Sequence, residues 1–341
     1  MMLNYDDMLN EAYLNGIFPR SDAALEAGSA WLKGRISKED FCKILEKETV
    51  EIINLQEELE LDYITDGQLF WHDFLRPFAS ALGLHRKGSS ADENPVTRQI
   101  YTNTFYRKPL IEKRITDFDK EIIDARFIET IPRGKRKIIL PSPFAFVYLS
   151  DGIHKNENGE LNISIFKEII LDISKVLNNE ARRLEKKSDV SFVQFNDSCM
   201  AYAKETELLW ETIIESLNVA AKDVHAITSL HLYNGDISLF LPKILDIPVQ
   251  RIGIDPYAAN LDKFKGIKFN KILELGAVNS KNSLVEEPQT IVQYAEEVIN
   301  KINPKGIALV PNRPLELVPK GIAIKKLESL SKAARLLRGA A

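Results

Sequence analysis

Short apolar runs alternate with helical stretches along most of the chain, and each run breaks into polar residues at its carboxyl end. The clearest runs are Ser191–Phe195 and Thr228–Leu232, which predict buried strands. Strands that end in polar residues on one side are typical of a parallel sheet whose functional edge is its carboxyl edge. A single strand followed by a polar loop can also be an ordinary segment whose polar residues only face water. The prediction therefore depends on how often the pattern recurs along the chain.

Eight such runs are predicted as strands, centred near residues 14, 63, 138, 193, 229, 252, 273 and 308. Predicted helices separate nearly all of them, and Lys38–Glu60 and Ile163–Lys187 are the longest. Strand and helix alternating eight times favour the α/β class and a single (β/α)8 TIM-type barrel spanning residues 1–341.

The segment 83–136 is too irregular and too long for a plain connection. We therefore expect an inserted excursion after the second strand, made of a β-hairpin and a short helix near Ile115–Ala125. The residues before it, Gln68–Leu82, predict a helix that packs its aromatic side chains inward.

Composition excludes several classes of protein. The 341 residues are 45% hydrophobic and carry a net charge of −4, which is ordinary for a soluble globular domain and gives no basic excess for nucleic acid. The two cysteines, Cys42 and Cys199, form no CxxC pair, so a reducing, cytoplasmic location is expected. No run of about 18 apolar residues predicts a signal peptide or a membrane span.

In such a barrel the site lies where the strands end. The polar residues placed there combine cations, carboxylates, one imidazole and several amides, which suits a zwitterionic or carboxylated small molecule. They include Arg20, Asp66, Ser142, Asn196, Asp197, His231, Tyr233, Asp255, Asn279, Asn312 and Arg313. Arg20 and Arg313 are candidates to clamp carboxylates with two parallel hydrogen bonds. P-loop, GxGxxG, GxSxG and HExxH motifs are all absent from the sequence.

At these positions the chain resembles cobalamin-independent methionine synthase. The similarity runs in family order from residue 17 to beyond residue 320 and rests on the stretches IFPRSDAALEAGSAWLKGRIS, LDYITDGQLFWHD, YTNTFYRKP, LPSPFAF, VQFNDS, HLYNGD, LELGAVNSKNS and ALVPNRPLELVP. The resemblance implies methyl transfer from a methyl-folate to the homocysteine thiolate. Many family members have two related barrels, of which the C-terminal one holds a zinc ion and the N-terminal one holds none and helps to bind the folate.

The family's zinc ligands do not carry over to this sequence. His231 stands at the histidine position and Asp255 at or near the glutamate position, but Tyr233 and Arg313 stand where the two cysteines belong. A zinc site needs at least three good ligands, so no metal site is expected in this chain. The Asp-Glu pair that the family places after VQ is Asn196-Asp197 here. The opening FPR motif and the late motifs are more similar to the N-terminal, zinc-free barrel.

Three functional hypotheses follow. In the first, the chain is a methyl-donor-binding or site-shaping component of a methionine synthase that works with a separate zinc-bearing barrel. In the second, it is a zinc-free methyltransferase in which Arg313 stabilises a thiolate and His231 is the base. The third is a non-catalytic ligand-binding or regulatory barrel.

The expected site residues are those placed at the strand ends, some of which also stand at the family's ligand positions. The expected catalytic residues are His231, Asp255 and Arg313. The expected substrate-binding residues are Arg20, Asp66, Ser142, Asn196, Asp197, Tyr233 and Asn312. A methyl-folate or another methyl donor is the expected substrate, and neither a cofactor bound by this chain alone nor a nucleic-acid or membrane partner is expected.

Overall fold

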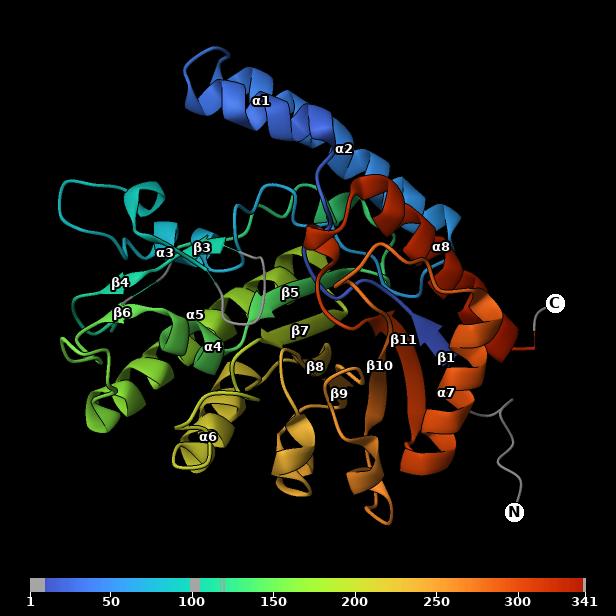
Figure 1. The fold of residues 1–341 in the computed structure, drawn as a ribbon. Helices are drawn as coiled ribbons and strands as arrows, with labels where there is room; N and C mark the ends of the chain where they lie inside the picture. Colours follow the sequence, from blue (N-terminus) through green and yellow to red (C-terminus); the bar gives the residue numbers. More distant parts are fainter. Residues whose placement is uncertain (1–9, 99–104, 117, 119, 340–341) are drawn as a thin grey trace.

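The computed structural model describes residues 10–98, 105–116, 118 and 120–339. A seven-stranded, fully parallel sheet forms its centre (Figure 1). The strands in spatial order are β1 (Asn10–Ala12), β11 (Gly306–Pro311), β10 (Ile272–Val278), β9 (Arg251–Ile254), β8 (Ile227–Leu232), β7 (Phe192–Asp197) and β5 (Lys137–Pro141). Each is buried on both faces, as the continuous apolar runs of the sequence predict. The α/β class is therefore confirmed.

The second predicted strand is much shorter than expected. Tyr63 makes one isolated parallel bridge to Tyr13, beyond the end of β1, and Ile64 makes another to Arg136, just before β5. This segment thus touches both edges of the seven-stranded sheet. The first strand, predicted near residue 14, lies at Asn10–Ala12 instead, and Asn15 beyond its end donates its side-chain amide to the Pro311 carbonyl oxygen.

Helices cover the outside of the sheet (Figure 1). The main ones are α4 (Pro143–Leu149), α5 (Ile163–Ser188), α6 (Trp210–Ala220), α7 (Pro288–Ile302) and α8 (Lys320–Leu337). The pair α1 (Asp22–Leu32) and α2 (Lys38–Glu58) extends away from the sheet. Ser21 and Ser37 cap these two helices by accepting the backbone N–H of Ala24 and Asp40, as the sequence predicts. After β8 and β9 short 3₁₀ turns, η4 (Ile237–Phe240), η5 (Lys243–Asp246) and η6 (Leu261–Phe264), replace full helices.

The excursion lies beside α3 (Arg76–Ala81) (Figure 1). Its β2 (Val96–Arg98) and β3 (Phe105–Arg107) pair antiparallel, which confirms the expected hairpin pairing, although residues 99–104 lie outside the described part. Two 3₁₀ turns, η2 (Ala91–Glu93) and η3 (Ile128–Thr130), also belong to it. Further on, β4 (Leu110–Ile111) pairs with β6 (Asp151–Gly152).

The short helix predicted near Ile115–Ala125 is wrong for the described residues of that stretch. Asp172 and Glu180 of α5 accept the backbone N–H groups of Ile115, Ile122 and Ile123. These carboxylates take donors that a helix would use internally, so the described residues of this stretch lie against α5 without forming a helix.

Charged side chains from several strands meet on the inner side of the sheet. Arg251 pairs with Glu11, its Nη1–H also donates to the Tyr13 hydroxyl at 3.1 Å, and that hydroxyl donates to Glu274 at 2.9 Å. Lys137 Nζ lies 3.8 Å from the centroid of the Tyr13 ring. Buried charges are stable only when paired, and this network pairs them across strands far apart in sequence.

Among the described residues, none of the helices has both the length and the apolar character of a bilayer-spanning segment.

Candidate functional site

A pocket opens at the carboxyl end of the sheet, above the first and last strands of the chain. Its cavity volume is about 20 Å³, so the lining side chains nearly fill it in this structure. Its apolar walls include Ile17, Trp71, Phe74 and Leu317. Its polar lining is Gln68, Asn196, Tyr233, Arg313 and Glu316. We call this the mouth pocket.

Arg313 is the cation of the mouth pocket. It follows β11 directly, is 5% exposed, and donates from Nη1 to Asn234 Oδ1 at 3.2 Å. Its Nε–H has no hydrogen-bond partner in the described part of the chain. Burial lowers the pKa of Arg313, while Asp255, Tyr233 and Glu316 oppose that shift. A buried guanidinium with a donor to spare is suited to bind a carboxylate or another anion.

Asp255 and Asn312 join the segments that follow β9, β10 and β11. Asn312 Nδ2–H donates to Asp255 Oδ1 at 3.0 Å, and Asn312 Oδ1 accepts from both the backbone N–H and the hydroxyl of Ser280 at 2.9 Å. Tyr257 N–H also donates to Asp255 at 3.1 Å. Neither Asp255 nor Asn312 lines the mouth pocket, so both position the loop that carries Arg313.

His231 lies deeper, on β8, and is fully buried. Its Nε2 lies 2.9 Å from Asn15 Nδ2 and 3.0 Å from the Asn312 carbonyl oxygen. Its Nδ1 faces the Glu274 carboxylate at 3.5 Å. Burial favours a raised pKa for Glu274, but His231, Lys137 and Arg251 outweigh it and hold that pKa below its ordinary value. The imidazole is therefore part of the packed floor beneath the pocket.

The pair Asn196-Asp197 divides between the pocket and the core. Asn196 lines the pocket and donates to the Asn15 carbonyl oxygen at 2.8 Å. Asp197 accepts the Ser142 hydroxyl and the backbone N–H groups of Cys199 and Met200, the latter two at 2.8 and 2.7 Å. Burial raises the pKa of Asp197 and these hydrogen bonds oppose the rise. Ser142 and Asp197 thus fix the turn after β7.

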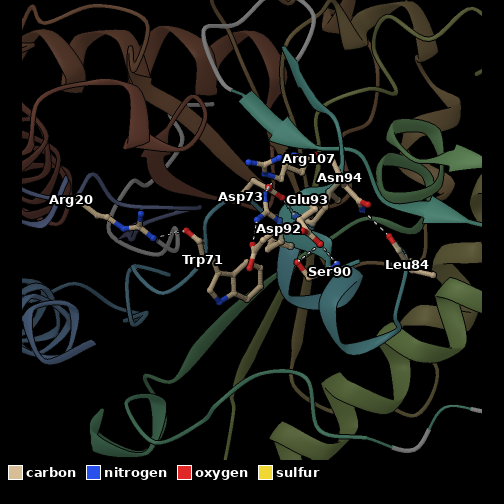
Figure 2. A network of polar contacts seen from close by, with 11 residues as sticks. Arg20, Trp71, Asp73, Leu84, Ser90, Asp92, Glu93, Asn94 and Arg107 are labelled. Carbon is tan, nitrogen blue, oxygen red and sulfur yellow. Dashed lines mark hydrogen bonds and ion pairs between the residues drawn. The ribbon is translucent and has the colours of Figure 1, made fainter. Parts of the chain in front are cut away.

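Arg20 holds the backbone of the segment that forms one wall of the mouth pocket. Its guanidinium donates to the Leu69 carbonyl oxygen at 2.9 and 2.6 Å and to the Trp71 carbonyl oxygen at 3.1 Å. Figure 2 shows this side chain reaching the backbone of Trp71. Asp66 lies on the other side of Trp71, in a separate cavity. The structure therefore brings Asn196, Tyr233 and Arg313 together, and places the other expected site residues around them.

Sequence reasoning missed several residues of the mouth pocket. Gln68, Trp71 and Phe74 all belong to the stretch that the sequence predicts as a helix packing its aromatic side chains, and Glu316 was not singled out. Gln68 has a left-handed backbone, with φ of 54°, which is uncommon for a side chain of this size. The one signal available was position, because Gln68 follows Asp66-Gly67 at the end of a predicted strand.

The donors at the mouth do not suit zinc. His231 Nε2 already contacts Asn15 and Asn312, and the ring beside it is the Tyr233 phenol, with centroids 6.0 Å apart, which is a poor zinc ligand. Cys199 Sγ is buried elsewhere, 3.3 Å from the Tyr202 hydroxyl, and burial raises the pKa of its thiol to about 12. In the described part of the chain no three His, Cys, Asp or Glu side chains are grouped to hold a metal ion.

Comparison with known proteins identifies the family of the chain. Residues 76–303 match the family model described as the N-terminal domain of the cobalamin-independent synthase. A methionine synthase from Sulfurisphaera tokodaii is 22% identical over 327 residues, covering 95% of this chain and 91% of that protein. One from Saccharolobus solfataricus is 23% identical over 329 residues, covering 95% and 93%.

Solved structures show the same fold. A B12-independent methionine synthase from Shewanella sp. W3-18-1, in complex with selenomethionine, superposes with a TM-score of 0.75 at 15% identity, covering 97% of this chain and 98% of that one. A methyltransferase from Methanosarcina mazei gives a TM-score of 0.57 at 12% identity, covering 96% and 94%.

Proposed function

Because the chain belongs to the cobalamin-independent synthase family through the N-terminal domain of that family, we propose that it takes part in methyl transfer to the homocysteine sulfur, giving methionine. Its part is to bind the methyl donor or to shape the site beside a separate zinc-bearing barrel. The relatives from Sulfurisphaera and Saccharolobus are named methionine synthase, and the match covers nearly their whole length. Both points support this choice.

Arg313 is the observation that carries the proposal. Its unpartnered Nε–H, together with the amides of Gln68 and Asn196, gives the mouth pocket a binding surface for a carboxylate group. Amino acids and folates both carry carboxylates. The selenomethionine bound by the Shewanella protein is an amino acid of this kind held by the same fold.

A partner chain is proposed because the mouth of this chain lacks thiolate ligands. A zinc ion on such a partner would hold homocysteine as the thiolate, the form that attacks a methyl group. This chain would then supply Arg313 and the aromatic wall of Trp71 and Phe74 to the shared site. His231, Asp255, Asn312, Ser142 and Asp197 would act as positioning residues, since each is held in hydrogen bonds outside the pocket.

For the fold, we propose that the sheet belongs to one closed (β/α)8 ring over residues 1–341, with 83–136 inserted into it. The bridges Tyr13–Tyr63 and Ile64–Arg136 support closure, because they connect the two edge strands through one intervening segment. A cytoplasmic location is part of the same proposal.

A zinc-free methyltransferase is less favoured, because its proposed base, His231, is fully buried beneath the pocket. The same observation favours a non-catalytic ligand-binding barrel as the second candidate. In that case the mouth pocket would still bind a carboxylated molecule through Arg313, and no methyl transfer would depend on this chain.

The test is to reconstitute methyl transfer from the purified chain and a zinc-bearing barrel from the same source. We expect the mixture to exceed the rate of either chain alone, and Arg313→Gln to reduce the gain by at least about tenfold, since a lost charged hydrogen bond is worth about 1.5–3 kcal/mol. Arg133→Gln is the matched control, because Arg133 is exposed and far from the mouth. A mixture that is no faster than the partner alone, with the carboxylated ligand still binding, would favour the non-catalytic barrel.

A further inference from the structure

Trp71 lies between the mouth pocket and a larger second cavity. The mouth pocket has a cavity volume of about 20 Å³, which leaves room for about one water molecule. The second cavity measures about 260 Å³, and Trp71 lines it together with Phe70 and Phe127. Sites for small molecules are much larger than the closed mouth pocket. A ligand can therefore reach Arg313 only after a side chain that closes the pocket has moved.

The backbone around Trp71 is held on both sides. Before it, Arg20 donates to the carbonyl oxygens of Leu69 and Trp71, the second of these bonds being visible in Figure 2. After it, Asp73 accepts a hydrogen bond from Arg76 Nη2–H at 2.8 Å. Because both ends of this turn are fixed, the part that is free to move is the Trp71 side chain and not the loop.

Packing alone holds the indole in place. Its ring meets the Phe78 ring edge-on, with centroids 6.1 Å apart, and its N–H has no hydrogen-bond partner among the described residues. A change of rotamer therefore breaks no hydrogen bond, but it needs space, since a close-packed interior leaves none. The second cavity provides that space, because a cavity of about 150 Å³ already accommodates a benzene ring.

We propose that Trp71 is the gate of the mouth pocket. Its side chain swings into the second cavity, the two spaces join, and the unpartnered Nε–H of Arg313 becomes accessible to a carboxylated ligand. Phe74 and Leu317 also line the mouth pocket, but neither lines the second cavity, so neither has this space to enter. The role of the gate in ligand access rests on the proposed function, whereas the motion of the ring does not.

Thiol labelling of the full chain tests the gate without any ligand. The reporter is Ile17→Cys, at a position that is 9% exposed and lines the mouth pocket, in a Cys42→Ser background. The probe is methyl methanethiosulfonate, and mass spectrometry of the peptide that contains residue 17 gives the labelling rate. Cys199 stays in place, because burial raises the pKa of its thiol to about 12 and makes it slow to react.

Ser80→Phe closes the space that the ring enters. Ser80 is an exposed residue of α3 that lines the second cavity, so a phenyl ring there should slow labelling of the reporter at least tenfold. Trp71→Ala should accelerate labelling at least tenfold. Ser164→Phe, at an exposed position of α5 that lines neither cavity, is the matched control and should label as the parent does.

The effect of Ser80→Phe decides the proposal, because a purely structural role of Trp71 would not depend on Ser80. If the folded Ser80→Phe protein is labelled at the parent rate, the mouth pocket opens by another route and the gate is overturned. If Ser80→Phe does not fold, the smaller Ser80→Leu replaces it under the same criterion. Slower labelling without any gain in the methyl-transfer assay would keep the gate and reject the proposed function, and the reverse pair of results would do the opposite.

Discussion

At the scale of single residues, His231 and Arg313 have similar sequence contexts, but one side chain lies in the core and the other lines the mouth pocket. Both stand at the end of an apolar run, so the sequence places both at the mouth. His231 is still within β8 and pairs in register with Gly253 of β9, whereas Arg313 lies beyond β11. Because side chains alternate along a strand, a shift of one or two residues decides whether a group reaches the pocket or the core.

Gly253 makes room for the buried imidazole. A Cβ at this position would overlap the His231 ring and lie 2.8 Å from Glu274 Oε2. We expect Gly253→Ala to destabilise the protein by about 1–3 kcal/mol or more, as overpacking of a rigid core does. Urea unfolding measures the loss.

Gly321→Ala is the control, because a Cβ there meets nothing within 4 Å and the residue lies in α8. It should be neutral or stabilising by up to about 1 kcal/mol. Equal effects of the two alanines would contradict the packing of His231 against Gly253.

The buried carboxyl group of Asp66 should make the free energy of unfolding depend on pH. Its pKa is raised by burial from 3.8 to about 6, so the folded protein holds this proton more tightly than the unfolded chain does. Stability contributed by this group is therefore present below about pH 4 and lost as the pH rises through about 6. Asp66→Asn should gain about 1–3 kcal/mol over the parent at pH 7.5 and almost nothing at pH 4. A gain of the same size at both pH values, measured by thermal unfolding, would show that ionisation is not the cause.

At the scale of elements, the segment 68–82 departs most from its pattern. Its composition predicts one helix, but only α3 (Arg76–Ala81) forms. Gln68 has a left-handed backbone, and Arg20 draws the carbonyls of Leu69 and Trp71 out of any helical pattern. Asp73 accepts the backbone N–H groups of Leu75 and Arg107, which ties the segment to β3. Long-range side chains thus override local helix propensity here.

Arg20 is the residue that fixes this segment. Arg20→Gln should leave the Leu69 and Trp71 carbonyls without their donors and cost about 1–3 kcal/mol. We expect faster amide hydrogen exchange in peptides covering residues 68–74 and unchanged exchange in β8 and β9. Arg133→Gln, an exposed arginine, should change neither. Unchanged exchange in 68–74 would mean that other contacts hold the pocket wall.

At the scale of the whole molecule, contacts between distant parts of the chain hold the sheet together. Asn10 of β1 donates to the Leu337 carbonyl oxygen of α8 at 3.2 Å, and Arg338 pairs with Asp62. Inside the sheet, Arg251 joins Glu11 across 240 positions of sequence. The first and last elements of the described chain therefore depend on each other.

Arg251→Met should be among the most damaging changes. It leaves the buried Glu11 and Glu274 carboxylates without their arginine, and breaking such a pair costs about 3–5 kcal/mol. Global unfolding by urea should show the loss, and adding Glu11→Gln should restore part of it. Lys301→Met, which breaks an exposed pair with Asp262, should change stability by less than about 1 kcal/mol. A small effect of Arg251→Met, or no recovery in the double variant, would mean that the network is not essential to the fold.

The sequence by itself determined the class of fold, six of the parallel strands (β5, β7, β8, β9, β10 and β11), the caps of α1 and α2 and the resemblance to the family. These features depend on local pattern, that is, on apolar periodicity, on Ser21 and Ser37 before helices, and on motifs in fixed order. Only the tertiary structure decided that His231 lies in the core, that Arg20 clamps a backbone segment, and that Trp71 separates two cavities. Those outcomes depend on which hydrogen bonds and packing contacts distant residues offer one another, and no local pattern of apolar and polar residues encodes them.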